Sequence, residues 1–192
     1  MELRCLFLDL GKSNKNGVVT SRTFLSPEAD AEFAVEHAIK CGYRLIDTAV
    51  AYKNHRGVGK AIKKCIEEGV IKREELFVTT KLWICDWKAE NVKKSIAACL
   101  KELQLDYIDL LLIHQAVQFN LPEEEEEKRQ KGDFHDYTPF VPDDAKYRIG
   151  YSKDRLKETW TALEELYDQV VIILSSHLVE SASCYWYLQF LF

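Results

Sequence analysis

Four side chains in this sequence could act together on a carbonyl group. Asp47, Lys81 and His114 each follow a short, mostly apolar run. The fourth, Tyr52, comes five residues after Asp47. In α/β folds, catalytic groups gather at the carboxyl ends of the strands and in the loops after them, so these four positions are candidates for one site.

These residue types suit proton transfer to a carbonyl oxygen. A phenol is a weak acid at neutral pH, and a lysine ammonium beside it favours the phenolate, so Tyr52 would give up its proton more easily next to Lys81. Asp47 can supply the counter-charge that the lysine needs. His114 can hydrogen-bond a carbonyl oxygen and orient it, and no metal is needed. Because side chains supply no hydride, this chemistry implies a nicotinamide cofactor.

Each of these side chains also has a purely structural interpretation. Asp47 could cap a helix, and Tyr52 could lie on the surface. Lys81 could extend its stem over apolar surface with its ammonium in water, and His114 could be a hydrogen-bonded histidine at the rim of a sheet. Taken singly, the residues leave both interpretations open.

Apolar periodicity predicts alternating helices and strands. Helical spacing predicts helices at about 27–41, 54–68, 89–103 and 152–168, and short apolar runs predict strands at 5–10, 43–47, 76–80, 107–113 and 170–174. The three central strands begin about 30 residues apart, which is the size of a βαβ unit. This pattern predicts a parallel sheet of the α/β class, and right-handed crossovers would place residues 47, 81 and 114 on one rim.

The bulk composition is that of an ordinary soluble domain. Of the 192 residues, 47% are apolar and 30% are charged, and the net charge of -5 offers no basic surface for nucleic acid. The six cysteines, at 5, 41, 65, 85, 99 and 184, form no C-x-x-C pair, which favours reduced thiols in the cytoplasm over a disulfide framework or a zinc site. The first apolar run is too short for a secretory signal, and Glu180, His177 and several serines interrupt the apolar tail, so we expect no membrane association.

A long polar segment, residues 121–150, precedes the last predicted helix. It holds five consecutive glutamates at 123–127 and three of the four prolines. Charge runs of this kind are usually solvated and mobile, so we expect this segment to be either a lid or disordered.

Four segments and one tyrosine resemble the aldo-keto reductase family. The segments are GYRLIDTA (42–49), FVTTKLW (77–83), YIDLLLIH (107–114) and ETWTALEEL (158–166). The family's tetrad of Asp, Tyr, Lys and His matches Asp47, Tyr52, Lys81 and His114 in order and spacing. The resemblance covers about residues 26–169. It implies a TIM barrel that reduces aldehydes or ketones to alcohols with NADPH.

The resemblance also implies a role for each side chain. Tyr52 would be the general acid, tuned by Lys81 and Asp47, and Asp47 would also contact the cofactor. His114 would orient the carbonyl of a small substrate, and Trp83 would line the substrate pocket beside it.

The chain departs from the family pattern in ways that bear on activity. A complete barrel has eight strands over about 250 residues, whereas this sequence offers four to five βα units. We expect residues 1–169 to form the N-terminal half of such a barrel and residues 170–192 to be a divergent apolar tail. The basic residues that hold the cofactor's 2′-phosphate are not recognisable. The alternative is therefore a catalytically inactive half-barrel, truncated at its C-terminal end, that acts by self-association through its open sheet edges.

Overall fold

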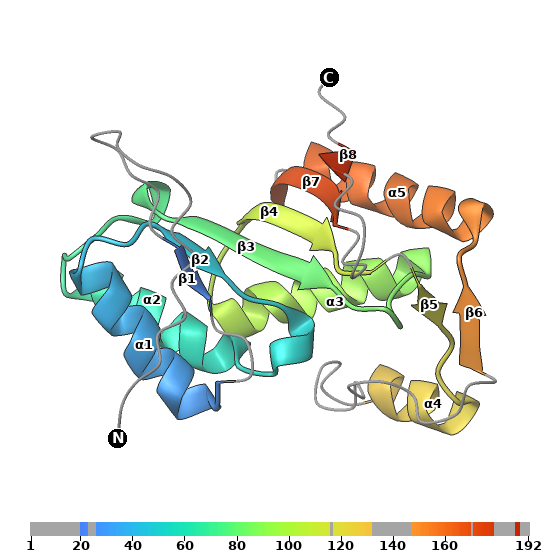
Figure 1. Cartoon of the computed structure of the whole chain (residues 1–192), viewed down its shortest axis with the longest axis horizontal. Helices are drawn as coiled ribbons and strands as arrows, with labels where there is room; N and C mark the ends of the chain where they lie inside the picture. The colour runs from blue at the N-terminus through green and yellow to red at the C-terminus, as the bar shows by residue number, and fades with distance from the viewer. Residues whose placement is uncertain are drawn as a thin grey trace.

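A mostly parallel sheet organises the structure (Figure 1). The computed structural model describes residues 20–22, 26–115, 117–131, 147–169, 171–178 and 187–188. The strand order is β1-β2-β3-β4-β7-β8, with β1 to β7 parallel and β8 antiparallel to β7. The strands are β1 Thr20–Arg22, β2 Leu45–Asp47, β3 Phe77–Leu82, β4 Ile108–Ile113, β7 Ile172–Leu178 and β8 Tyr187–Leu188. Strands that follow one another along the main sheet are neighbours in space, as repeated βα units require.

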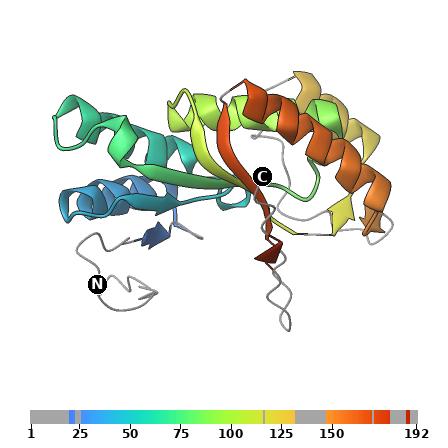
Figure 2. The same ribbon diagram turned by 90° about the horizontal axis from the view of Figure 1, so that it is seen from above.

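Helices connect these strands and follow one another along the sheet (Figure 1, Figure 2). They are α1 Glu28–Lys40, α2 His55–Glu67, α3 Ala89–Leu103 and α5 Lys153–Asp168, with the 3-10 helices η1 Val50–Tyr52 and η2 Arg73–Glu75. α1 packs against α2, α2 against α3, and α3 against α5. The described residues thus form four βα units and a fifth parallel strand, which agrees with the four to five units expected, although β1 was not among the predicted strands. No helix in the described ranges has both the length and the apolar character to cross a bilayer.

Most predicted elements agree with the structure to within two residues. This holds for the four helices and for the strands predicted at 43–47, 76–80 and 107–113. The strand predicted at 170–174 corresponds to β7, which extends further, to Leu178. The strand predicted at 5–10 lies outside the described residues.

The apolar core forms two clusters of buried side chains. One lies where α1 and α2 meet the sheet and includes Val35, Ile46, Val58, Ile62 and Val78. The other lies where α3 and α5 meet the sheet and includes Ile96, Cys99, Leu111 and Leu163. Because the strands contribute to both clusters, the packing that holds the helices also fixes the strand ends that carry the candidate residues.

Two glycines let α2 approach both of its neighbours closely. A Cβ at Gly57 would lie 2.2 Å from the carbonyl oxygen of Glu28, where α1 begins. A Cβ at Gly59 would lie 2.5 Å from the carbonyl oxygen of Glu102, near the end of α3. Both contacts are with backbone, which cannot move aside as a flexible side chain would. α2 is therefore held tightly between α1 and α3.

The glutamate run, expected to lie in a lid or in a disordered segment, begins the helix α4, Glu123–Lys131. Acidic residues in its first turn and basic residues in its last turn complement the helix dipole. Pairs one turn apart, such as Glu124–Lys128 at 3.5 Å and Glu127–Lys131 at 3.0 Å, stabilise it further. Figure 1 shows α4 apart from the main sheet, near the antiparallel pair β5 Gln118–Phe119 and β6 Arg148–Gly150. Residues 132–146 lie outside the described part, so the expected lid is untested there.

Candidate active site

Asp47 and Lys81 meet because β2 and β3 are adjacent parallel strands. Asp47 ends β2 and aligns with Thr79 of β3, two residues before Lys81. Lys81 Nζ donates to both carboxylate oxygens of Asp47, at 2.8 and 2.9 Å, and to the carbonyl oxygen of Thr48 at 3.0 Å. Lys81 is only 3% exposed. Its charge is therefore compensated mainly by the carboxylate and by backbone oxygen, because little water can reach it.

Tyr52 reaches the same ammonium from the loop after β2. The 3-10 helix η1 ends at Tyr52, and Lys53 follows in the left-handed conformation with φ 53°. The Tyr52 hydroxyl oxygen accepts a hydrogen bond of 3.1 Å from Lys81 Nζ. One ammonium thus links the carboxylate at the end of β2 to the phenol in the loop.

His114 and Trp83 join the group from the ends of β4 and β3. The backbone N–H of His114 donates to the carbonyl oxygen of Leu82 at 3.1 Å, which continues the pairing of these strands. The imidazole centroid lies 6.0 Å from that of Tyr52 and 5.3 Å from that of Trp83, with interplanar angles of 77° and 63°. Both are edge-to-face contacts, a favourable arrangement for aromatic rings.

The structure therefore brings all four tetrad side chains, and Trp83, into one cluster at the carboxyl ends of β2, β3 and β4. For Lys81 and Tyr52, the structure disfavours the purely structural interpretations. The Lys81 ammonium is buried in an ion pair and does not extend into water, and Tyr52 is 5% exposed and does not lie on the surface. Asp47 differs from the others because 19% of its side chain stays exposed. The catalytic roles of these residues stay predictions.

Sequence reasoning missed the polar contacts that support this cluster. His55, in the first turn of α2, hydrogen-bonds Thr80 Oγ1 through Nε2 at 3.0 Å and Glu102 Oε2 through Nδ1 at 3.3 Å. It therefore ties α2 to both β3 and α3. The alternation of side chains along β3 places Thr80 on the face opposite Lys81, and a buried threonine on that face predicts a polar partner.

A second supporting contact holds the loop that carries Tyr52. Asn54 Nδ2 donates to the carbonyl oxygen of Ser26 at 3.0 Å, and Thr48 Oγ1 donates to Asn54 Oδ1 at 3.3 Å. The two bonds connect the end of β2 to the residues that precede α1. Both Thr48 and Asn54 are buried, so these bonds are shielded from water.

A separate cavity of about 560 Å³ lies beside α4, and its lining includes Trp87, Asn91 and Phe119 but none of the tetrad. Within the described ranges, no group of three or more His, Cys, Asp or Glu side chains is arranged to hold a metal ion.

Comparisons with known proteins point to one family. The model of the aldo/keto reductase family matches residues 17–171. The NAD(P)H-dependent D-xylose reductase of Scheffersomyces stipitis is 42% identical over 137 residues, which are 69% of this chain and 39% of that protein. Aldo-keto reductase family 1 member A1 of Homo sapiens is 36% identical over 167 residues, which are 86% of this chain and 46% of that protein.

Solved structures agree. The aldose reductase of Schistosoma japonicum matches with a TM-score of 0.69 and 27% identity, over 91% of this chain and 52% of that one. The aldose reductase of Giardia lamblia matches with a TM-score of 0.70 and 29% identity, over 84% of this chain and 49% of that one. The chain thus spans about half the length, or less, of the relatives it matches. Its parallel βα units and the match over most of its residues lead to one conclusion: the chain belongs to the aldo/keto reductase family, whose fold is the TIM barrel.

Proposed function

We propose that this chain reduces aldehydes or ketones to alcohols, with NADPH as the hydride donor. The observation that carries the proposal is the position of Lys81 Nζ, 3.1 Å from the Tyr52 hydroxyl oxygen and 2.8 Å from Asp47 Oδ1. The relatives named D-xylose reductase and aldose reductase support a carbonyl substrate.

Tyr52 is the proton donor in this reaction. NADPH, when bound, would supply a hydride to the carbonyl carbon, and negative charge would develop on the carbonyl oxygen. The Tyr52 hydroxyl gives its proton to that oxygen, so the phenol O–H bond breaks as the alcohol O–H bond forms. Lys81 stabilises the phenolate that remains, and Asp47 holds the ammonium in place.

His114 and Trp83 position the carbonyl group. The imidazole lies edge-on to both Tyr52 and Trp83, so a carbonyl oxygen that it hydrogen-bonds would be held next to the phenol. Trp83 is 3% exposed and offers a flat apolar wall beside the imidazole. Fixing the reacting oxygen in this way saves the entropy that a free encounter would lose.

Asp47 is the residue that would contact the cofactor. Its side chain is 19% exposed, whereas that of its partner Lys81 is 3% exposed, so a polar group of the cofactor can reach the carboxylate without breaking the ion pair. An open polar group beside a buried cluster fits such a ligand. The choice of NADPH is part of the proposal, because the xylose reductase is named NAD(P)H-dependent. Titration with each dinucleotide, followed by its fluorescence, measures the preference.

Tyr52→Phe in the full chain tests the proposal. The variant loses the proton donor and keeps the ring, so we expect aldehyde-dependent NADPH oxidation to fall by about 10²–10⁴-fold. NADPH binding should be unchanged. Tyr151→Phe is the matched control, because Tyr151 is 62% exposed and lies outside the cluster. Full turnover by Tyr52→Phe, or no change in NADPH fluorescence with the unmodified protein at high concentration, would contradict the proposal.

The open edge of the sheet favours a second candidate function, association with another copy of the chain. Among the described strands, β1 pairs with β2 on one side and forms an edge of the sheet. An edge strand presents unpaired backbone groups that can pair with another chain. Light scattering after gel filtration distinguishes the two candidates. A dimer without NADPH binding supports the inactive alternative, and a monomer at every concentration contradicts it.

The proposed compartment is the cytoplasm. Within the described residues, Cys41, Cys65 and Cys85 form no disulfide. A reducing compartment keeps thiols in this state. Fractionation of cells that express the tagged chain checks this, and recovery in a secreted fraction would contradict it.

A further inference from the structure

Polar contacts hold α4 against the protein. Its sequence, EEEEEKRQK, contains no apolar residue, so it has no apolar face to bury. Yet the Arg129 side chain on this helix is 0% exposed. A fully buried guanidinium on an otherwise solvated helix needs a partner that compensates its charge.

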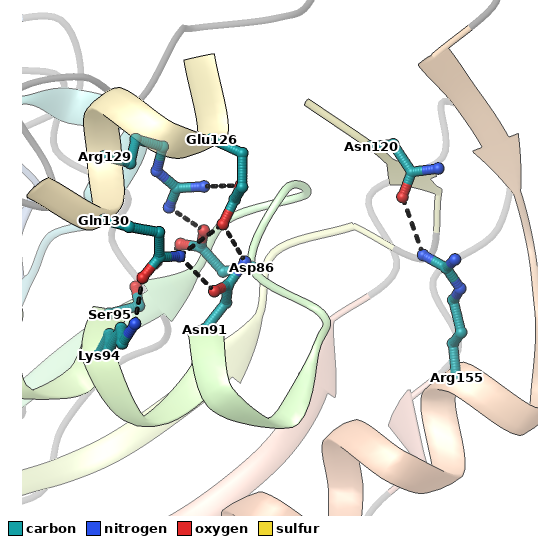
Figure 3. A network of polar contacts seen from close by, with 9 residues as sticks. All are labelled: Asp86, Asn91, Lys94, Ser95, Asn120, Glu126, Arg129, Gln130 and Arg155. Carbon is teal, nitrogen blue, oxygen red and sulfur yellow. Dashed lines mark hydrogen bonds and ion pairs between the residues drawn. The ribbon is translucent and has the colours of Figure 1, made fainter. Parts of the chain in front are cut away.

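Its fully buried partner is Asp86, in the loop between β3 and α3, and Glu126 Oε2 on α4 itself lies 3.5 Å from Arg129 Nη1 (Figure 3). Arg129 forms an ion pair with Asp86 Oδ1, and both side chains are 0% exposed. The second oxygen, Oδ2, accepts a hydrogen bond of 2.9 Å from Ser95 Oγ of α3. Removing one partner of such a pair leaves a buried charge uncompensated, which is strongly destabilising.

A second layer of contacts joins α4 to α3 beside this ion pair. Asn91 Nδ2 donates to Glu126 Oε1 at 3.0 Å, and Gln130 Nε2 donates to Asn91 Oδ1 at 3.0 Å. Figure 3 shows these groups next to Arg129, with Lys94 hydrogen-bonded to Gln130 at the outer side. The helix is therefore held at several points, with the ion pair as the most deeply buried one.

A single turn connects Asp86 of the ion pair to Trp83, the proposed wall of the substrate pocket. The backbone N–H of Asp86 donates to the carbonyl oxygen of Trp83 at 3.0 Å, which closes the turn from Trp83 to Asp86. The Trp83 ring in turn contacts His114. A shift of Asp86 would therefore move the backbone that sets the position of the Trp83 ring.

We propose that Arg129 is a positioning residue: its ion pair with Asp86 holds the turn from Trp83 to Asp86 and keeps Trp83 against His114. The role of Trp83 as the wall of a carbonyl site rests on the proposed function, whereas the clamp on the turn does not. α4 thus influences the candidate site without being part of it, because the buried Asp86 carboxylate in the loop between β3 and α3 needs the Arg129 cation of α4.

Cys85 reports on this turn without any ligand. It lies inside the turn and is 5% exposed. Burial, with a further contribution from the Asp86 carboxylate, raises the pKa of the Cys85 thiol to about 12, and the Arg129 cation opposes that rise. Removing the cation from a turn that stays closed would therefore slow alkylation, because thiolate is the reactive form. Cys85 lines the cavity beside α4, so faster alkylation means that the turn or α4 has moved away and uncovered the thiol.

The test is alkylation of the full chain by iodoacetamide, with the rate at each cysteine read by peptide mass mapping. We expect Arg129→Met to accelerate labelling of Cys85 by at least about tenfold, because loss of a buried partner favours local opening. Lys128→Met, at a half-exposed neighbour on the same helix, should leave the rate unchanged. Cys65 and Cys99, both 0% exposed, report on global unfolding and should stay slow.

Two further variants keep the test decisive if Arg129→Met folds poorly. Arg129→Lys keeps the charge but loses the planar guanidinium, so an intermediate rate is expected. The double variant Asp86→Asn/Arg129→Met removes both charges and should return the Cys85 rate toward that of the unmodified protein. Equal Cys85 rates in Arg129→Met and Lys128→Met, or equal acceleration at Cys65 and Cys99, would overturn the clamp.

Kinetics then test the link to Trp83. In protein that turns over, Arg129→Met should raise KM for the aldehyde several-fold, while kcat and NADPH affinity change less, because the wall contacts the substrate and not the cofactor. Unchanged KM despite faster Cys85 labelling would overturn that link. Absence of turnover in the unmodified protein would contradict the proposed function alone, since the labelling result stands without cofactor or substrate.

Discussion

Lys81 Nζ lies 3.1 Å from the hydroxyl oxygen of Tyr52, and that contact uses one of the three protons of the ammonium. The other two protons are donated to the Asp47 carboxylate and to the Thr48 carbonyl oxygen. All three donors of Lys81 are therefore engaged, which fixes the cation relative to the phenol. Fixed charges of this kind need little reorganisation when a reaction develops charge beside them.

Lys81→Met should abolish most of the proposed activity. The variant keeps most of the length of the side chain but leaves no cation to stabilise the Tyr52 phenolate, so we expect kcat to fall by about 10²–10³-fold. Lys63→Met, on the exposed side of α2, is the control. Stopped-flow measurement of a single turnover at saturating cofactor separates chemistry from release. A loss confined to KM would mean that Lys81 binds substrate and does not assist proton transfer.

Gly59→Ala should destabilise the fold. The new Cβ would lie 2.5–2.6 Å from backbone atoms of Glu102 and Leu103, so α2 and α3 would have to move apart. We expect a loss of about 1–3 kcal/mol in the free energy of unfolding, as for other overpacked cores, even though alanine is the better helix former. Urea unfolding followed by circular dichroism measures it, with Lys63→Ala as the reference on the same helix. Equal or greater stability of Gly59→Ala would show that α2 and α3 can accommodate a methyl group between them.

Thr80→Val should also destabilise the fold, by a different route. Valine has nearly the same shape but removes the hydroxyl that hydrogen-bonds His55 Nε2 in the buried space between β3 and α2. We expect a cost of about 1–3 kcal/mol, the usual range for a buried polar group that loses a partner. Thr79→Val, on the opposite face of β3, serves as the control in thermal unfolding. Identical melting temperatures for the two variants would argue against a stabilising role for the His55 contact.

Glu36→Gln should change stability in a way that depends on pH. Hydrogen bonds from Lys40 and Lys64 lower the pKa of the Glu36 carboxyl from 4.5 to about 2. Since the folded-state pKa is depressed, the stabilisation is present above the unfolded-state value and is lost as the pH falls from 4.5 toward 2. Urea midpoints of the two proteins should therefore differ at neutral pH and converge over that window.

Salt supplies a second check on the Glu36 cluster. The charges lie on the surface, so about 1 M salt should screen the pairs and reduce the difference between the two proteins. A difference that persists well below pH 2, where the carboxyl is protonated in both the folded and the unfolded state, would show that Glu36→Gln acts through something other than the charge of the carboxylate.

The parallel strands and the tetrad could be predicted because each follows from local pattern. Apolar runs recur at the spacing of a βα unit, and a parallel sheet brings the carboxyl ends of neighbouring strands to one edge. Asp47, Lys81 and His114 each come at or just after a strand end, so their proximity follows from topology. The exact reach of Tyr52 could not be predicted, because it depends on η1 and on the left-handed backbone at Lys53.

α4 and its contacts could not be predicted in the same way. A run of glutamates has no apolar period, and its helix is stabilised by charge pairs and by one buried arginine whose partner lies 43 residues earlier in the sequence. Nothing in the local sequence distinguishes Arg129 from its exposed neighbours Lys128 and Lys131. The same holds for His55, whose two partners come from β3 and α3 and are brought together only by the fold.

The close contacts at Gly57 and Gly59 have a consequence for how mutations in this protein would be interpreted. Only Lys53 and Asn54 separate Tyr52 from the first residue of α2. A shift of that helix relative to the sheet would therefore also shift the Tyr52 hydroxyl. Substitutions in the helices around the sheet, away from the tetrad, would then impair the proposed proton transfer from Tyr52. For such variants, both turnover and melting temperature should be measured. A small displacement of the helix would lower turnover before it lowers the melting temperature.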